Sequence, residues 1–266
     1  MPLERPVAAP VIEPVIAIVQ ARMSSTRLPS KVMKPVCGRP ILWHVVNRLK
    51  SSEFIDETVI ATTTEASDDI IEEWCTLHGI RFYRGSLNDV LDRYYQAAKE
   101  FGARTIVRVT SDCPLIDPAL VDRAIKKFSE GSFDHVSIDP SFPDGLDAEV
   151  FSFDALAKAH REAALASERE HVTPYIWKNP EVFRLHKIKS PRDLSRMRWT
   201  VDDEKDLMLV TKIFEGMGPA EEVFHCEDIL RFLESRPDLL KINSDTARNE
   251  GYARSLKQDA AAKRIA

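Results

Sequence analysis

Glycine is scarce in this sequence, and the glycine-rich motifs that mark many nucleotide-binding loops are absent. Nine of the 266 residues are glycine, and neither G-x-G-x-x-G nor G-x-x-x-x-G-K-[ST] occurs. These absences argue against a nicotinamide-dependent oxidoreductase and against a P-loop enzyme. A phosphate group bound by this chain would therefore be held largely by side chains.

Cysteine is scarce as well, and the chain has neither a net positive charge nor a long apolar run. The four cysteines are isolated and lack metal-ligand spacing; with no secretory signal, we expect reduced thiols in a cytoplasmic protein. The formal net charge of −5 argues against a broad nucleic-acid-binding surface. No apolar run is long enough to span a bilayer, so neither nucleic acid nor a membrane is an expected partner.

Short β-prone runs alternate with amphipathic helical patterns through the first half of the chain. This alternation predicts βαβ units around a parallel sheet. The expected strands are 15–20, 58–63, 80–84 and 105–110. Helices are expected over 41–49, from an N-cap at Ser67 to Gly79, over about 87–101, and from Asp117-Pro118 to about 131.

The pattern changes after residue 135. Further strands are expected at 135–138, 149–153, 182–188 and 197–201, and helices at 155–164, 168–177, 205–215 and 227–234. Two prolines and a glycine interrupt regular structure in 139–145. We therefore expect one domain over 15–243, in which 139–195 is an added lid or acceptor subdomain that carries the second substrate site. Residues 1–14 are expected to be a flexible leader and 244–266 a tail, frayed over 260–266.

A cationic, hydroxyl-rich loop follows the first expected strand. Residues 16–34 read IAIVQARMSSTRLPSKVMK, so Arg22, Arg27 and Lys31 are interspersed with serine and threonine. Arginine can contact two phosphate oxygens at once, and lysine adds a compact charge. The loop is suited to a polyanion such as a nucleoside triphosphate; the alternative is an ordinary surface loop with scattered charges.

Two later strand-like runs end in aspartate. Asp112 follows RVTS, and Asp202 follows RWTV immediately before a helix. Each could simply stabilise a turn or cap a helix. Together with the cationic loop they form a coherent site, because Mg²⁺ is typically held by one or two carboxylates plus substrate phosphates and water.

Six motifs in this order resemble the cytidylyltransferases that activate acidic sugars, the enzymes that make CMP-ketodeoxyoctulosonate and CMP-sialic-acid-type products. The similarity is greatest to the branch named for spore-coat polysaccharide biosynthesis protein F, and it covers about residues 15–252. The motifs are Ala21-Arg22-x-x-Ser25-x-Arg27-Leu28-Pro29-x-Lys31, Arg84-Gly85-x-x-x-Asp89-Val90-Leu91-x-Arg93-Tyr94, Thr110-x-Asp112-Cys113-Pro114-Leu115-Ile116-Asp117, Asp144-Gly145-Leu146-Asp147-x-Glu149-Val150, Arg169-Glu170-His171-Val172-Thr173-Pro174-Tyr175 and Thr200-Val201-Asp202-x-x-x-Asp206-Leu207.

The resemblance implies a three-layer α/β fold like that of the nucleotide-diphospho-sugar transferases, with a mixed, mostly parallel sheet. It also implies Mg²⁺ as cofactor and CTP as co-substrate. The CTP-binding residues it implies are Ala21, Arg22, Ser25, Arg27, Lys31, Arg84, Asp89 and Thr110, and the metal ligands are Asp112 and Asp202. The chain departs from the pattern at Ser30, where glycine is common, and at Thr110, where the octulosonate enzymes carry glutamine.

The resemblance assigns the acceptor less firmly. It points to Asp144, Asp147, Glu149, Arg169 and His171. The first three could equally be a solvated acidic loop, and a lone helical histidine is more often a packed or surface residue. No motif names the acceptor sugar. Relatives often form dimers through the added subdomain, so a homodimer is expected.

The function that these motifs imply is transfer of CMP from CTP to an acidic sugar, with release of pyrophosphate, in cell-surface or spore polysaccharide biosynthesis. Arg22, Lys31, Asp112 and Asp202 are the expected catalytic residues. One alternative is a nucleotidyltransferase that uses another nucleotide, or a sugar-phosphate or phosphonate acceptor. A second is a nucleotide-binding module without turnover.

Overall fold

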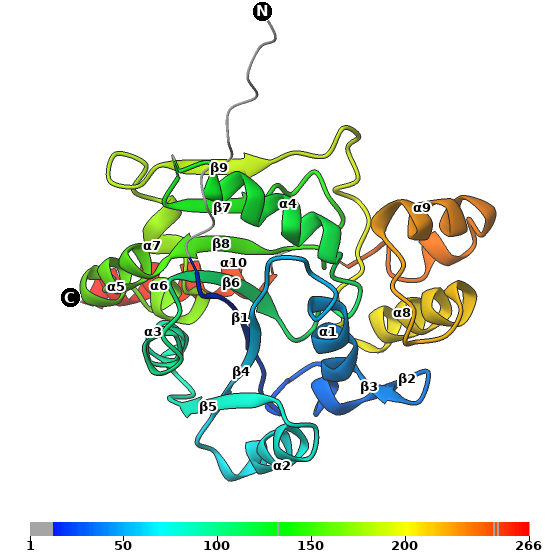
Figure 1. Ribbon diagram of the computed structural model, residues 1–266, viewed down its shortest axis with the longest axis horizontal. Helices are drawn as coiled ribbons and strands as arrows, with labels where there is room; N and C mark the ends of the chain where they lie inside the picture. The colour runs from blue at the N-terminus through cyan, green and yellow to red at the C-terminus, as the bar shows by residue number, and fades with distance from the viewer. Residues whose placement is uncertain (1–12, 132, 247, 249, 266) are drawn as a thin grey trace, which may run out of the picture.

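A seven-stranded sheet forms the centre of the molecule (Figure 1). The computed structural model describes residues 13–131, 133–246, 248 and 250–265, so most of the leader predicted for 1–14 lies outside the described residues. Strand β1 (Val15–Gln20) lies between β4 (Glu57–Thr63) and β6 (Thr105–Thr110), and β5 (Arg81–Gly85) pairs with β4. All of these pairings are parallel.

The second half of the chain extends this sheet. Strand β8 (Glu149–Ser152) runs antiparallel to β6 and to β7 (His135–Ile138), and β9 (Leu185–Ile188) pairs with β7 in parallel. Segment 139–195, predicted as an inserted subdomain, thus contributes β8 and β9 to the central sheet. The prediction of an α/β fold with a mixed, mostly parallel sheet is confirmed.

Helices cover both faces of the sheet because the strands are apolar on both sides. Along β1, Val15, Ala17 and Val19 face one core, and Ile16 and Ile18 face the other. The first core is completed by α1 (Ile41–Leu49), α2 (Asp69–Leu77), α4 (Pro118–Ser129), α8 (Glu204–Met217) and α9 (Cys226–Ser235). The second is covered by α3 (Val90–Glu100), α5 (Phe153–Glu162) and α7 (Pro174–Trp177), and α6 (Ala166–His171) packs against α3. Shorter elements are η1 (Lys31–Met33), β2 (Pro35–Val36), β3 (Arg39–Pro40), η2 (Ala66–Asp68) and η3 (Leu239–Lys241).

Side-chain caps fix where two of these helices start. The Asp117 carboxylate accepts a hydrogen bond from Ala119 N at 2.9 Å, as the Asp117-Pro118 pair predicts. Asp89 caps α3 by accepting from Asp92 N at 2.9 Å. The N-cap predicted at Ser67 is wrong, because η2 passes through that position and α2 begins at Asp69.

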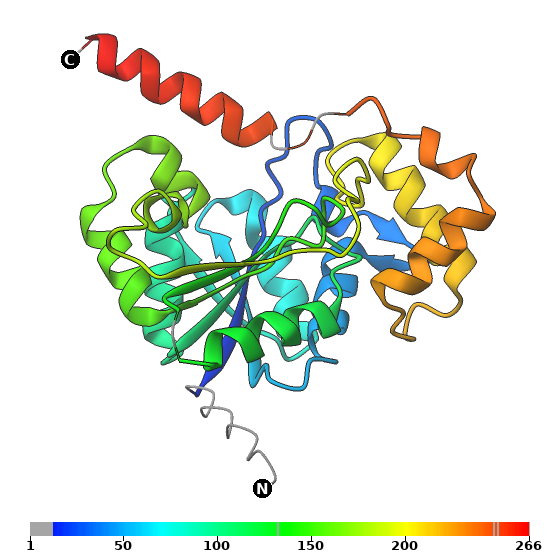
Figure 2. The same ribbon diagram turned by 90° about the horizontal axis from the view of Figure 1, so that it is seen from above.

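Two further predictions are wrong. Segment 197–201 is not a strand: it forms one isolated bridge between Asp144 and Arg198, because its backbone donors bond to turns, as when Val201 N donates to Asp112 O at 2.8 Å. Residues 260–265 are not a frayed end, since they belong to α10 (Glu250–Ile265). Figure 2 shows α10 lying across the end of the molecule from which the loop after β1 emerges. None of the helices within the described residues combines the length and apolarity that a bilayer crossing requires.

Candidate active site

The three sequence signals meet at the carboxyl edge of the parallel strands, where open α/β sheets bind ligands. Lys31, in the loop after β1, places Nζ 2.8 Å from Oδ2 of Asp112, which follows β6. The same ammonium lies 2.8 Å from Oδ1 of Asp202, at the start of α8. The two predicted metal ligands therefore share one cation, although they are far apart in the sequence.

Charge pairing stabilises the ionised forms of these groups. Burial by itself raises the pKa of Asp112, but the Lys31 ammonium and its hydrogen bond outweigh burial and lower that pKa to about 2. Burial likewise works against the charge on Lys31, yet Asp112 and Asp202 raise the lysine pKa above its ordinary value. At neutral pH the cluster is thus a lysine cation between carboxylates.

The rest of the cationic loop leaves positive charge near the same edge. Arg27 Nη2 lies 2.9 Å from Asp202 Oδ2, and Arg27 also pairs with Glu250 at the start of α10. Arg22 is exposed and forms no hydrogen bond or ion pair with any residue that the structure describes. Of the three predicted loop cations, Arg22 is therefore the one that could bind an anion without first breaking an ion pair to a carboxylate of the described residues.

The shape of this loop depends on backbone contacts. Ala21 N donates to Ala61 O at 3.1 Å, and the Ser25 hydroxyl accepts from Leu28 N at 3.4 Å. Ser30 has φ 58°, which lies in the left-handed region that favours glycine. Glycine is common at this position in the enzymes whose motifs this sequence resembles. The chain thus keeps the glycine-like turn with a serine.

Sequence reasoning missed the residue that anchors the loop at its start. The buried Asp68 accepts a hydrogen bond from Met23 N at 2.7 Å and another from the Thr63 hydroxyl. In the sequence, Asp68 is recognisable only as an aspartate next to the expected cap Ser67. Its backbone partner, Met23, lies 45 residues away in the chain. No local pattern identifies such a pairing.

A second cluster adjoins the first. Arg198 contacts Asp202 at 2.6 Å, Asp144 at 2.6 Å and Asp206 at 3.0 Å. Burial and the neighbouring Asp147 raise the pKa of Asp144 to about 7, against the opposing effect of Arg248 and Arg198. The predicted acceptor residue Asp144 is therefore linked to the predicted metal ligand Asp202 through one guanidinium.

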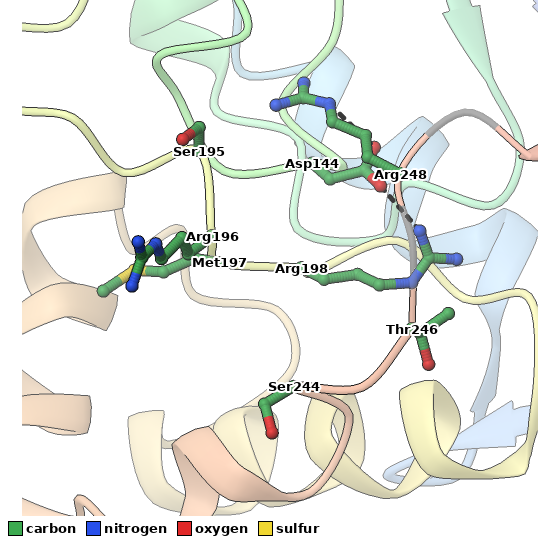
Figure 3. Close-up of a pocket in the computed structure, with 8 residues that line it drawn as sticks. All are labelled: Asp144, Ser195, Arg196, Met197, Arg198, Ser244, Thr246 and Arg248. Atoms are coloured by element: carbon green, nitrogen blue, oxygen red, sulfur yellow. Dashed lines mark hydrogen bonds and ion pairs between the residues drawn. The ribbon is translucent and has the colours of Figure 1, made fainter.

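A pocket of about 350 Å³ lies beside this cluster (Figure 3). Arg248 closes one side of it, with Nη2 2.6 Å from Asp147 and Nη1 2.8 Å from Pro140 O. The pocket is lined by Asp144, Ser195, Arg196, Met197, Arg198, Ser244, Thr246 and Arg248. Three arginines and three hydroxyl groups around one carboxylate make a lining suited to a hydroxylated anion.

Glu149 belongs to a separate cluster that is also largely buried. Its carboxylate lies 2.6 Å from Arg108 Nη1 and 3.0 Å from His135 Nε2, and it accepts from the Thr173 hydroxyl at 2.8 Å. Burial alone raises the Glu149 pKa, but Arg108 and the contact from His135 outweigh it and lower that pKa to about 2. Glu149 is thus ionised and fully engaged within the protein.

The remaining predicted residues are distributed around the edge. Arg84 is bound to α2 through Asp69, at 2.7 Å, and through Glu72. Asp89 pairs with Arg169, with Arg169 Nε 3.0 Å from both carboxylate oxygens. The other two contact closer neighbours: Thr110 Oγ1 lies 3.2 Å from Cys113 Sγ, and His171 Nε2 lies 3.0 Å from the Ser255 hydroxyl of α10.

Asp112 and Asp202 supply carboxylate oxygens of the kind that Mg²⁺ prefers, and in this structure the Lys31 ammonium lies between them. Within the described part of the chain, no group of three or more His, Cys, Asp or Glu could hold a metal ion alone. Two carboxylates such as Asp112 and Asp202 are nevertheless enough for Mg²⁺, which takes its other ligands from phosphate oxygens and water. A metal here would therefore depend on a phosphate-bearing substrate.

Comparison with known proteins relates this site to a family. The family model described as cytidylyltransferase matches residues 16–229. An uncharacterized protein of Methanocaldococcus jannaschii is 38% identical over 240 residues, which cover 90% of this chain and 97% of that protein. Spore coat polysaccharide biosynthesis protein SpsF of Bacillus subtilis is 32% identical over 231 residues, which cover 84% of this chain and 95% of SpsF.

A solved structure gives the same result. A cytidylyltransferase from Leptospira borgpetersenii superposes with a TM-score of 0.80 at 34% identity, covering 85% of this chain and 96% of that one. Agreement of this extent in both sequence and fold reaches well beyond a shared α/β architecture. With the family model matching from β1 into α9, the chain belongs to the cytidylyltransferase family.

Proposed function

We propose that this enzyme transfers CMP from CTP to an acidic sugar, with release of pyrophosphate. The contact of Lys31 with both Asp112 and Asp202 carries the proposal, because it gathers a phosphate-loop cation and two metal-type ligands at one point. In the reaction, an acceptor oxygen attacks the α-phosphorus as the bond to the β-phosphate oxygen breaks. Such transfer depends mainly on positioning and charge neutralisation.

The cationic loop would bind the triphosphate. Arg22, which has no ion-pair partner in the described residues, would contact phosphate first, and Arg27 would follow by exchanging a carboxylate for a phosphate oxygen. Lys31 would stabilise the charge that develops on the departing pyrophosphate. Fixed donors of this kind act strongly where water is excluded.

Asp112 and Asp202 would hold the metal ion. Mg²⁺ bound there would neutralise phosphate charge and polarise the α-phosphoryl group. Asp112 is ionised throughout the physiological range, because the Lys31 ammonium lowers its pKa to about 2, and a metal ion would share or replace that ammonium as its partner.

The acceptor would bind on the side of the arginine-lined pocket. Arg196 is exposed at its wall, and Asp144, which also lines it, is linked to Asp202 through Arg198. Asp147 pairs with Arg248 of the same pocket. Guanidinium groups favour a carboxylate, and the hydroxyls of Ser195 and Thr246 favour a polyol. An acidic sugar combines both features. The name of the Bacillus relative supports a role in polysaccharide biosynthesis.

The base would bind near Thr110 and the 84–93 segment. Thr110 replaces the glutamine of the octulosonate enzymes, so CTP selectivity needs a direct test. Each of the four nucleoside triphosphates is incubated with Mg²⁺ and a panel of ulosonic acids, and pyrophosphate release is followed. We expect turnover with CTP and a CMP-linked product by mass spectrometry; turnover restricted to another nucleotide would overturn the CTP assignment.

An Asp112→Asn variant tests the metal assignment. We expect pyrophosphate release to fall by on the order of 100-fold or more, because a neutral amide is a poor metal ligand. The fold should survive, since Lys31 keeps its contact with Asp202. Asp238→Asn, at an exposed pair with Arg236, is the matched control and should retain activity. Full activity of Asp112→Asn would contradict the assignment.

A further inference from the structure

Arg198 is a buried cation surrounded by carboxylates. Its side chain is 6% exposed, and Nε lies 3.0 Å from Oδ1 of Asp206, which is fully buried. Asp206 is itself held by Asn243 Nδ2 at 2.8 Å and by Asp202 N at 2.9 Å. The base of the guanidinium is therefore anchored on a fixed carboxylate at the start of α8.

The two terminal nitrogens of Arg198 reach the two halves of the site. Nη1 lies 2.6 Å from Asp144 Oδ2, and Nη2 lies 2.6 Å from Asp202 Oδ2. In Figure 3 the guanidinium points toward Asp144, and Arg248 approaches the same carboxylate. The planar fork of arginine can make these contacts at once, which a lysine ammonium on a flexible stem cannot reproduce.

Backbone hydrogen bonds hold the segment that carries Arg198 against the loop that carries Asp144. Asp144 N donates to Met197 O at 2.9 Å, and Thr200 N donates to Asp144 O at 3.1 Å. At Gly145 a Cβ atom would lie 2.5 Å from Thr200 N, so the two segments touch without room for a side chain. The loop bearing Asp144 and the segment bearing Arg198 thus behave as one packed unit.

These contacts determine how Asp202 is oriented. Oδ2 of Asp202 receives Arg198 at 2.6 Å and Arg27 at 2.9 Å. Oδ1 is left to face Lys31, at 2.8 Å, on the side of Asp112. Without Arg198, the Asp202 carboxylate would keep Arg27, which is itself part of the exposed loop, as its only guanidinium partner in the described structure.

We propose that Arg198 is a positioning residue: it holds the Asp202 carboxylate turned toward Asp112 and ties that orientation to the Asp144 loop. The inference rests on the proposed function, in which Asp202 is a metal ligand. It goes further than that function because it assigns a role to Arg198, which contacts neither the cationic loop after β1 nor the expected position of the metal, but does contact a proposed metal ligand. Groups that orient metal ligands typically change metal affinity by about 10- to 100-fold when they are altered.

The test compares Arg198→Lys with Arg184→Lys in the full chain. Arg184 also forms a two-contact pair with an aspartate, Asp134, but on an exposed surface. Mn²⁺ binding is titrated with CTP present, using the paramagnetic signal of free Mn²⁺. We expect Arg198→Lys to raise the Mn²⁺ dissociation constant by about 10- to 100-fold and Arg184→Lys to leave it within about twofold.

A second variant covers the case in which Arg198→Lys does not fold. Asp206→Asn keeps an oxygen acceptor for Arg198 Nε but weakens its anchor, and should raise the Mn²⁺ dissociation constant less, by about 3- to 10-fold. A folded Arg198 variant with a lower melting temperature and unchanged Mn²⁺ affinity would overturn the inference and leave a purely structural role. If the unsubstituted protein binds CTP but no Mn²⁺, the metal assignment of the proposed function fails first.

Discussion

At the scale of single residues, the Glu149 carboxylate joins three strands and the start of α7 through Arg108, His135 and Thr173. Its pKa of about 2 lies below its usual value, so folding favours the ionised form. The stabilisation is therefore fully present above about pH 4.5 and is lost as pH falls toward 2. Breaking a buried pair of this kind costs about 3 kcal/mol.

Glu149→Gln should lower the free energy of unfolding by about 3 kcal/mol at pH 7. The difference in unfolding free energy between the two proteins should shrink at pH 3, because below about pH 4.5 Glu149 takes up a proton in the unfolded chain but stays ionised in the folded one, which favours unfolding. Urea denaturation of both proteins at pH 7 and pH 3 measures this difference in unfolding free energy. Glu130→Gln, at an exposed pair with Lys127, should change stability by less than about 0.5 kcal/mol. An equal gap at both pH values would refute the electrostatic account.

The sequence singles out a polar side chain most readily where it stands at the end of an apolar run. Asp112 follows the parallel strand β6, whereas Asp202 follows a segment that is not a strand and reaches the same edge because Val201 N bonds to Asp112 O. Both carboxylates contact Lys31. Arg198 and Asp68 were missed. Their roles depend on partners in distant segments, and a buried arginine looks in sequence like a surface one.

At the scale of elements, β1 and β6 have the predicted bounds because each is a short β-prone run limited by polar residues. Helix α10 was missed because its contacts with the body of the protein are largely polar, including Ser255 with His171 and Asp259 with Ser167 N. A helix without an apolar stripe gives no periodic signal. The family model also ends before it, at residue 229.

The position of α10 has a consequence for nucleotide binding. Glu250, in its first turn, pairs with Arg27, which the proposed function assigns to the triphosphate. A triphosphate must displace this carboxylate and would be repelled by it. Exposed ion pairs contribute at most about 1 kcal/mol, so the effect on affinity is about fivefold or less.

Glu250→Gln should therefore tighten CTP binding by about two- to fivefold, measured by isothermal titration calorimetry at low ionic strength. The gain should shrink in high salt, because both partners are partly exposed. Glu222→Gln, a substitution outside the site, serves as the control for loss of one negative charge. Unchanged or weaker CTP binding in Glu250→Gln would show that Glu250 does not compete with phosphate.

At the scale of the whole molecule, the site is assembled from segments that are far apart in the chain. The loops after β1 and β7, the end of β6, the start of α8 and the start of α10 all contribute charged groups. Lys31, Arg27 and Arg198 are already paired with carboxylates of the site without substrate. A ligand that bridges these segments binds the folded chain and not the unfolded one, so it must stabilise the fold.

CTP with Mg²⁺ should consequently raise the melting temperature. At 100 times the dissociation constant, linkage gives about 2.7 kcal/mol, or about 5–10 °C for a chain of this size. Removing the metal with EDTA should reverse most of the shift, because Asp112 and Asp202 would then face the phosphates without a bridging cation. GTP at the same concentration is the control for selectivity. Equal shifts with CTP and GTP would contradict selectivity for cytosine, and no shift with either nucleotide would contradict the triphosphate site itself.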